Sequence, residues 1–292
     1  MTQQDINPED RRAAWRAIGI FLFIMIAISA VFDTIMAKQG AMSTLMVTGV
    51  MWAPGIAAIL TCLYLGRSVS SLPWSWGKWR WNWYALALPI VYGLAMYIPV
   101  WLFGLGGSGF PNMETLAGWS SQVTNSPETS MPAAVLFFFI LMTIGMVGAV
   151  SRALGEEIGW RGFLIWEMRK VMPFGAVGIM SGLIWGIWHW PGILFTDYNA
   201  GEGNLVLQMF LFTLSIAPQG IIYAYFSFKS NSLWPAVFLH ASHNLFIQGV
   251  LTPLTISGNR THFYIDEFGI LLPIASCVVA FYFLRRAKAE GL

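Results

Sequence analysis

The feature that most constrains this chain is a series of apolar runs, each about as long as a membrane-spanning helix, with short connections between them. A helix needs about 20 mainly apolar residues to cross the hydrocarbon core of a bilayer. Eight such runs follow one another, at residues 17–36, 44–65, 84–103, 133–153, 174–195, 205–226, 233–251 and 268–284. The sequence therefore predicts an all-α fold, a polytopic transmembrane bundle of about eight helices.

Composition agrees with this class and excludes several others. Hydrophobic residues make up 57% of the chain and charged residues only 10%, whereas a soluble domain carries about 25% charge. The 292 residues leave no room for a separate soluble domain, so residues 1–292 are expected to form a single integral membrane domain in contact with the lipid bilayer. A formal charge of +2 is too small to indicate a nucleic-acid partner. Cys62 and Cys277 lie in separate apolar runs and are interpreted as core residues, not as a disulfide or metal site.

The distribution of basic residues predicts an orientation in the membrane. Of the 16 lysines and arginines, all but Lys38 and Arg260 fall in connections on one side of the eight runs. Cytoplasmic connections retain Lys and Arg, so both termini are expected in the cytoplasm of a cell-membrane protein. The segment 74–83 interleaves tryptophan with basic residues, a pattern typical of the headgroup layer; stacking on single-stranded nucleic acid is the less favoured alternative. The polar segment 104–132 is the longest loop and is expected to cover one mouth of the bundle.

A charge cluster at residues 155–161 is the first sign of chemistry. Ionisable residues at membrane depth are costly and are usually retained for pairing, transport or catalysis. Glu157 and Arg161 are four residues apart and share one helical face, while Glu156 points about 100° away from Glu157. We therefore expect Arg161 to pair with Glu157 in a supporting role, and Glu156 to face the centre of the bundle.

Further polar residues lie in other apolar runs: His189 in the fifth, and His240, His243 and Asn244 in the seventh. His240 and Asn244 share a helical face, and His243 lies only about 60° from His240, so either histidine can face the site. A carboxylate and an imidazole can activate water, and a second imidazole with a carboxamide can stabilise an oxyanion. Together these residues supply the groups that peptide hydrolysis needs.

Simpler explanations exist for single members of this set. His189 taken alone is better explained by a hydrogen bond to a carbonyl that the nearby Pro191 exposes. Asn244 alone most often makes an interhelical hydrogen bond. The expected helix boundaries also place the groups at different depths, with Glu156 near the cytoplasmic surface and His189 about 22 Å from the start of its helix. The three helices can converge only if the fourth continues past residue 155 or the fifth begins outside the hydrocarbon.

Three short motifs resemble those of a known family, the membrane-embedded CAAX-processing and bacteriocin-processing proteases (CPBP or Abi family), which are related to the Rce1-type prenyl endopeptidases. The motifs are Glu-Glu-x-x-x-Arg at residues 156–161, an aromatic residue four positions before a histidine at residues 185–189, and His-x-x-x-Asn at residues 240–244. They stand in the family's order on successive apolar runs, within residues 133–251. Trp185 departs from the phenylalanine common in the family, a change of packing more than of chemistry.

The resemblance implies roles for individual residues. It assigns the activation of water to Glu156 and His189 and the oxyanion hole to His240 and Asn244, and it selects His240 over His243. It also implies an intramembrane endopeptidase of the CAAX prenyl protease 2 type, acting on a peptide or protein substrate at the membrane. The distribution of basic residues places Glu156 and Glu157 at the cytoplasmic end, so the site is expected to open to the cytoplasmic side.

Several alternatives remain open at this stage. Zinc is possible, because Glu156, His189 and His240 match a common two-histidine, one-carboxylate ligand set, and the family has been called a metalloprotease family. We rank metal-free glutamate catalysis above it, since Asn244 suits an oxyanion donor better than a zinc ligand. The chain has no His-Glu-x-x-His, Gly-x-Ser-x-Gly or Gly-x-Gly-Asp signature of other membrane proteases. A non-enzymatic immunity or scaffold protein and a proton-coupled transporter are the other candidates. Substrate identity and oligomeric state are not encoded in any of these patterns.

Overall fold

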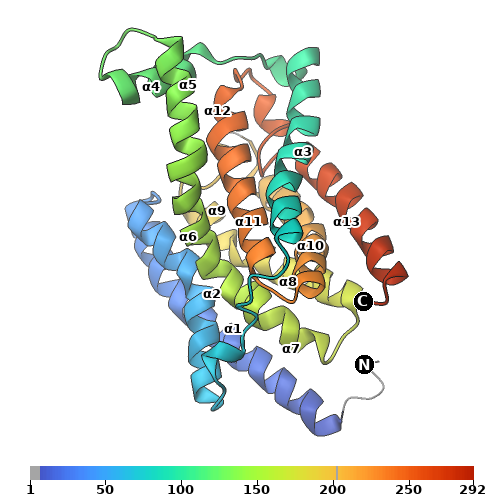
Figure 1. Cartoon of the computed structure of the whole chain (residues 1–292). Coiled ribbons are helices and arrows are strands. Elements are labelled where there is room, and N and C mark those ends of the chain that lie inside the picture. Colours follow the sequence, from blue (N-terminus) through green and yellow to red (C-terminus); the bar gives the residue numbers. More distant parts are fainter. Residues whose placement is uncertain (1–6, 202) are drawn as a thin grey trace.

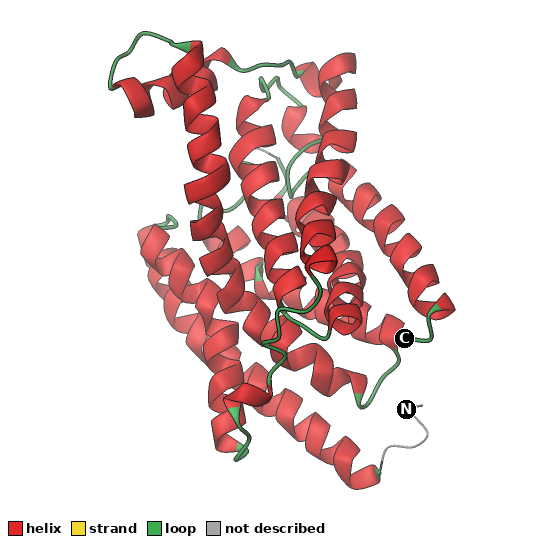
Figure 2. Cartoon of the chain, in the orientation of Figure 1, coloured by secondary structure: helices red, strands yellow, loops and turns green. Residues whose placement is uncertain are grey.

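The computed structural model describes residues 7–201 and 203–292, and helices account for most of them (Figures 1 and 2). Within these residues the β structure is one isolated bridge between Gly109 and Ile256. The α-helices are α1 (Pro8–Gln39), α2 (Thr44–Tyr64), α3 (Trp79–Phe103), α4 (Met113–Thr124), α5 (Met131–Ile140), α6 (Met146–Glu157), α7 (Ile165–Arg169), α8 (Phe174–Trp188), α9 (Trp190–Phe195), α10 (Leu205–Ser230), α11 (Trp234–His243), α12 (Thr252–Leu254) and α13 (Leu271–Ala289). Three π-helical segments continue them, η4 (Leu141–Gly145), η5 (Ile158–Leu164) and η6 (Asn244–Leu251).

The predicted fold class, an all-α membrane bundle, is confirmed. Among the described residues, six helices are long and apolar enough to cross a membrane, namely Pro8–Gln39, Thr44–Tyr64, Trp79–Phe103, Met131–Arg169, Phe174–Phe195 and Leu205–Ser230. Each of the eight predicted runs lies on a helix, and six of them match its bounds to within about five residues. The first helix begins well before residue 17, and the fourth continues well past residue 153. The last two runs correspond to the rod α11–η6–α12 and to α13, which are not among the six. The location of both termini in the cytoplasm stays a prediction.

The fourth predicted span was too short. Instead of ending at residue 153, the helix continues through η5 and α7, so that Met131–Arg169 forms one rod of 39 residues. The glutamates therefore lie inside a helix, and Glu156 is about 20 Å from the end of the rod at 1.5 Å per residue. This extension is one of the two changes that the convergence of the polar groups required, because it carries Glu156 into the bundle.

The polar segment after α3 contains a helix that the sequence did not predict. Helix α4 packs on α5 (Figure 1). Two hydrogen bonds also join the start of α4 to α12. The Thr115 hydroxyl donates to the carbonyl of Pro253 at 2.6 Å, and the amide of Asn112 donates to the carbonyl of Leu254 at 2.9 Å. The segment contributes no residue to the central cavity described below.

Small residues bring α8 and α10 into backbone contact. A Cβ atom at Gly220 would lie 2.1 Å from the carbonyl oxygen of Gly178, and one at Gly182 would lie 2.4 Å from that of Ala217. Close helix crossings in membranes depend on such positions. Helix α10 is buried along most of its length and lies at the centre of the bundle. Both cysteines are free; Cys62 is buried as expected, whereas Cys277 is exposed on α13, which corrects its assignment to the core.

Candidate active site

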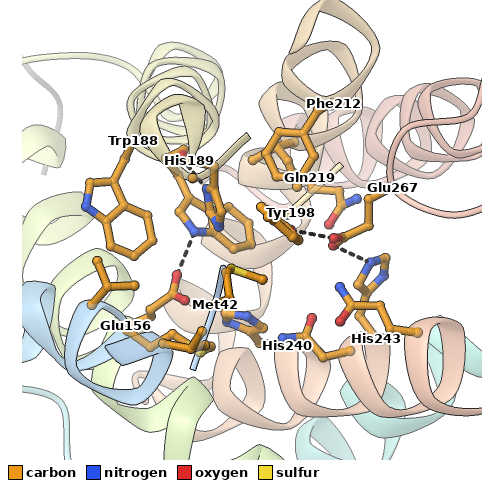
Figure 3. Close-up of a pocket in the computed structure, with 18 of the residues that line it drawn as sticks. Met42, Glu156, Trp188, His189, Tyr198, Phe212, Gln219, His240, His243 and Glu267 are labelled. Atoms are coloured by element: carbon orange, nitrogen blue, oxygen red, sulfur yellow. Dashed lines mark hydrogen bonds and ion pairs between the residues drawn. The ribbon is translucent and has the colours of Figure 1, made fainter. Parts of the chain in front are cut away.

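A cavity of about 160 Å³ lies in the middle of the bundle, and the predicted catalytic residues line it (Figure 3). Glu156 comes from the end of α6, His189 from the break between α8 and α9, and His240 and Asn244 from the junction of α11 and η6. Segments far apart in the sequence thus converge on one space. His240 and His243 both line this cavity.

Glu156 is held by two tryptophans. Its side chain is almost fully buried, and its Oε2 atom accepts hydrogen bonds from the indole Nε1 of Trp185 at 2.7 Å and of Trp160 at 3.3 Å. Both donors are uncharged. The carboxylate of Glu156 is therefore oriented in the cavity without a directly paired cation.

Glu157 has different partners, as its position on the helix predicted. The Nη1 atom of Arg161 lies 3.0 Å from both of its carboxylate oxygens, and all of these atoms are buried. The guanidinium of Arg161 lies between two aromatic rings, 4.3 Å from the centre of Trp185 and 4.0 Å from that of Tyr223. Cation–π contacts of this kind stabilise a buried arginine. The predicted Glu157–Arg161 pair is present. Arg161, which lies in η5, therefore contacts Glu157, Trp185 and Tyr223.

The sequence did not predict that Glu157 also binds His240. The Nδ1 atom of His240 lies 2.8 Å from Oε1 of Glu157. Because a carboxylate oxygen only accepts, Nδ1 carries the proton and donates it in this bond. Glu157 therefore fixes the orientation of the imidazole and the ring nitrogen that carries the proton.

His189 lies at the cavity and also bonds to a backbone carbonyl, although that carbonyl belongs to Trp185 and is not one that Pro191 exposes. Its Nδ1 atom donates to the carbonyl oxygen of Trp185 at 2.8 Å, which is the type of bond expected at a helix break. The ring nevertheless lines the cavity, packed against Trp188 and Phe212. Since Nδ1 carries the proton, Nε2 of the neutral ring keeps a lone pair that can accept one.

Two of the three motifs adjoin π-helical turns. Segment η5 begins directly after Glu157, and η6 begins at Asn244. Insertions of this kind in an α-helix are frequent at functional sites. The hydrophobic pattern contains no signal for them, because a π turn shifts the helical phase by only a fraction of a turn.

A second group of polar side chains lies at the cavity, and the sequence indicated only one of its members, His243. The Tyr92 hydroxyl lies 2.5 Å from Nδ1 of His243, whose Nε2 atom is 3.4 Å from Oε1 of Glu267. The Tyr198 hydroxyl donates to the other Glu267 oxygen at 2.5 Å, and Figure 3 shows Tyr198, Glu267 and His243 across the cavity from Glu156. The available signal was the acidic pair Asp266-Glu267, which directly precedes the last apolar run.

The candidate zinc ligands Glu156, His189 and His240 all line this cavity. Within residues 7–201 and 203–292, no group of three or more His, Cys, Asp and Glu side chains is arranged to hold a metal ion. The proposed ligands have other partners, since His240 bonds to Glu157 and the Oε2 atom of Glu156 bonds to two indoles.

Comparison with known proteins points to one family. Residues 133–246 match the model of the type II CAAX prenyl endopeptidase Rce1-like family, a segment that includes all three motifs. The chain is also similar to a CAAX prenyl protease 2 of Methanococcus maripaludis, with 27% identity over 129 residues. That alignment covers 43% of this chain and 45% of the relative, so less than half of the relative's length is matched. Segment 133–246 is therefore similar to the Rce1-like family.

Proposed function

We propose that this protein is an intramembrane endopeptidase that hydrolyses a peptide bond in a membrane-associated protein or peptide. The observation that carries the proposal is the convergence of Glu156, His189, His240 and Asn244 on one buried cavity from three separate stretches of the chain. The archaeal relative is named a prenyl protease, which supports the same reaction class.

The first chemical step is attack by water on the peptide carbonyl. Glu156 removes a proton from the water, and Nε2 of His189, unprotonated in the neutral ring, shares that proton as the new C–O bond forms. The carbonyl π bond opens, and its electron pair moves to the oxygen. Collapse of the tetrahedral intermediate then breaks the C–N bond, and the proton held by Glu156 passes to the leaving amine. A positioned general base contributes about 10²–10⁴ to such a rate.

His240 and Asn244 stabilise the oxyanion of that intermediate. The Asn244 amide donates without any change of state. His240 already donates its Nδ1 proton to Glu157, so its Nε2 atom can donate to the oxyanion only when the ring is an imidazolium. Loss of one donor of this type costs about 10²–10³ in turnover.

A membrane-associated substrate is supported by a second, mainly apolar groove of about 780 Å³. This groove runs between α1 and the α8–α9 break, and it meets the catalytic cavity at Asp33 and Trp188, which line both. An apolar part of a substrate can thus remain at the lipid-facing surface while a peptide reaches Glu156. We propose that the protein lies in the cell membrane.

The deciding experiment compares protein termini in cells that carry wild type or Glu156→Gln. The amide of glutamine can still accept from the Trp185 indole, so the fold is retained, while the general base is lost. We expect at least one neo-terminus that is present with wild type and absent with Glu156→Gln. The matched control is Glu114→Gln, the same change on α4 outside the cavity, which should cleave as wild type does.

Glu156→Gln also distinguishes a protease from an immunity or scaffold protein and from a transporter. An immunity or scaffold protein would protect cells equally well with Glu156→Gln, and no neo-terminus would depend on that residue. A transporter would instead show proton-driven uptake in proteoliposomes. A zinc-dependent version would contain stoichiometric zinc, and its removal would abolish cleavage; we expect cleavage to persist after chelation.

A further inference from the structure

A small basic pocket lies between three helices and shares no residue with the catalytic cavity. It has a volume of about 180 Å³ and is lined by the start of α3, the end of α10 and the end of α13. Three of its lining residues are cations, Arg80, Lys229 and Arg286, and each comes from a different helix. Among the described residues that line it, Glu290 supplies the single carboxylate, so the lining carries a net charge of +2.

Packed aromatic rings hold the three helices together beside this pocket. The indole of Trp81, which is 6% exposed, packs edge-on against Tyr225 and Phe226 of α10, with ring centres 6.2 and 6.1 Å apart. The ring of Phe283 in α13 lies 4.8 Å from that of Tyr225. Rings from all three helices therefore fix the wall of the pocket before any ligand enters.

The same rings hold two of the cations in place. The Cζ atom of Arg80 lies 5.0 Å from the centre of the Trp81 ring, and that of Arg286 lies 5.9 Å from the centre of the Tyr225 ring. A guanidinium over an aromatic face is attracted by the ring quadrupole while its N–H groups remain free to donate at its edge. Both guanidinium groups can thus donate to an anion in the pocket.

Glu290 positions two of the cations but does not neutralise all three. Its Oε1 atom accepts from Nε of Arg286 at 2.9 Å, and its Oε2 atom accepts from Nζ of Lys229 at 2.9 Å. The hydroxyl of Tyr225 donates to Oε2 as well, at 2.9 Å. Within residues 7–201 and 203–292, no acidic side chain pairs with Arg80. An entering anion therefore meets one unpaired guanidinium and two cations whose positions are already fixed.

The pocket lies where a membrane protein meets lipid headgroups. The segment 74–83, which interleaves tryptophan with basic residues, leads into it. Trp79 and Trp83, on either side of Arg80 in α3, are both 60% exposed, as is typical of side chains at the membrane–water interface. Basic pockets between transmembrane helices on the cytoplasmic side bind anionic lipid headgroups, and the distribution of basic residues predicts that this end is cytoplasmic.

We propose that this pocket binds the headgroup phosphate of an anionic membrane phospholipid, with Arg80, Lys229 and Arg286 as its donors. Charge-assisted hydrogen bonds from guanidinium and ammonium groups are the strong contacts that phosphate oxygens make. The acyl chains lie along α3, where Tyr84 of the pocket and Val91, two turns further on, are both exposed on one helical face. The bound lipid joins α3 to α10 and α13, and this role does not depend on the proposed protease activity.

Thermal unfolding of the purified 292-residue chain in a neutral detergent tests the binding. Phosphatidylglycerol should raise the unfolding midpoint in a saturable way, because a ligand that binds only the folded state stabilises it. Phosphatidylcholine with the same acyl chains should leave the midpoint nearly unchanged. The rise should be lost in Arg80→Gln/Lys229→Gln. The matched control is Arg12→Gln/Arg16→Gln, which removes two exposed charges of α1 outside the pocket and should respond as wild type does.

Native mass spectrometry gives a second readout that needs no unfolding. The single variant Arg80→Gln leaves both ion pairs of Glu290 intact, so its fold is retained. Wild type should retain one phosphatidylglycerol under conditions that strip phosphatidylcholine, and Arg80→Gln should lose it. Retention by Arg80→Gln as strong as that by wild type, or an equal rise of the midpoint in the pocket and control double variants, would overturn the proposal.

Inorganic phosphate at constant ionic strength separates a lipid from a soluble ligand. Phosphate alone should leave the midpoint of wild type unchanged, because the acyl chains contribute to the affinity of the lipid. A rise with phosphate equal to that with phosphatidylglycerol would assign the pocket to a soluble phosphate compound and would refute the lipid assignment.

Discussion

At the scale of single residues, Glu157 shows what helical spacing can and cannot predict. Its partner Arg161 lies four residues away on the same helix, so the pair followed from the sequence. Its bond to His240 joins residues 83 positions apart, and only the packed fold could reveal it. The same holds for His243 and Glu267, because a contact between distant segments leaves no local pattern.

The contact between Glu157 and His240 predicts an effect on catalysis. In Glu157→Gln, the carboxylate that fixes the His240 imidazole is lost, so the ring no longer presents Nε2 to the oxyanion in one orientation. We expect kcat to fall by about 10-fold or more. The measurement is kcat on a peptide derived from an identified cleavage site.

Asn244→Ala is the matched comparison for that variant. It removes the other oxyanion donor and should lower kcat by about 10²–10³. A kcat of Glu157→Gln equal to that of wild type would mean that His240 does not stabilise the oxyanion, contrary to the role proposed here.

At the scale of elements, apolar runs located the helices well but not their continuity. The predicted end of the fourth span came from the polar residues at 155–157, yet the rod continues because Glu156 and Glu157 find partners inside the bundle. The glycines on either side of the two glutamates carry information that hydropathy does not. A Cβ atom at Gly155 would lie 2.7 Å from Cγ of Trp52, and one at Gly159 would lie 2.5 Å from Cβ of Pro54.

Gly159→Ala should therefore disturb the site through its helix packing. The added methyl group has to push η5 away from the α2 backbone around Pro54, an overpacking that typically costs about 1–3 kcal/mol. We expect a lower midpoint of thermal unfolding in detergent and reduced cleavage. The control is Gly19→Ala on α1, where a Cβ atom has nothing within 4 Å, and it should behave as wild type. Equal unfolding midpoints for the two variants would contradict this account of the α2 contact.

At the scale of the whole molecule, the order and approximate bounds of the helices followed from the sequence, but the cavity did not. The family match begins at residue 133, whereas part of the cavity wall comes from α1 and α2, through residues such as Asp33 and Met51. Helix α3 adds Tyr92 as the partner of His243. The three motifs identify the candidate catalytic residues, whereas helices that carry no motif, such as α1 and α2, form part of the cavity wall.

A divided chain tests this dependence of the site on its unmatched half. The break is placed after Pro127, in the connection between α4 and α5, where the backbone carries no cavity residue. Residues 128–292 alone contain Glu156, His189, His240 and Asn244, yet they lack the wall formed by α1 and α2, so we expect no cleavage. Expressed together with residues 1–127, they should copurify and recover Glu156-dependent cleavage, because the two halves bury a large apolar surface against each other. Cleavage by residues 128–292 alone would show that α1 and α2 are dispensable for the reaction.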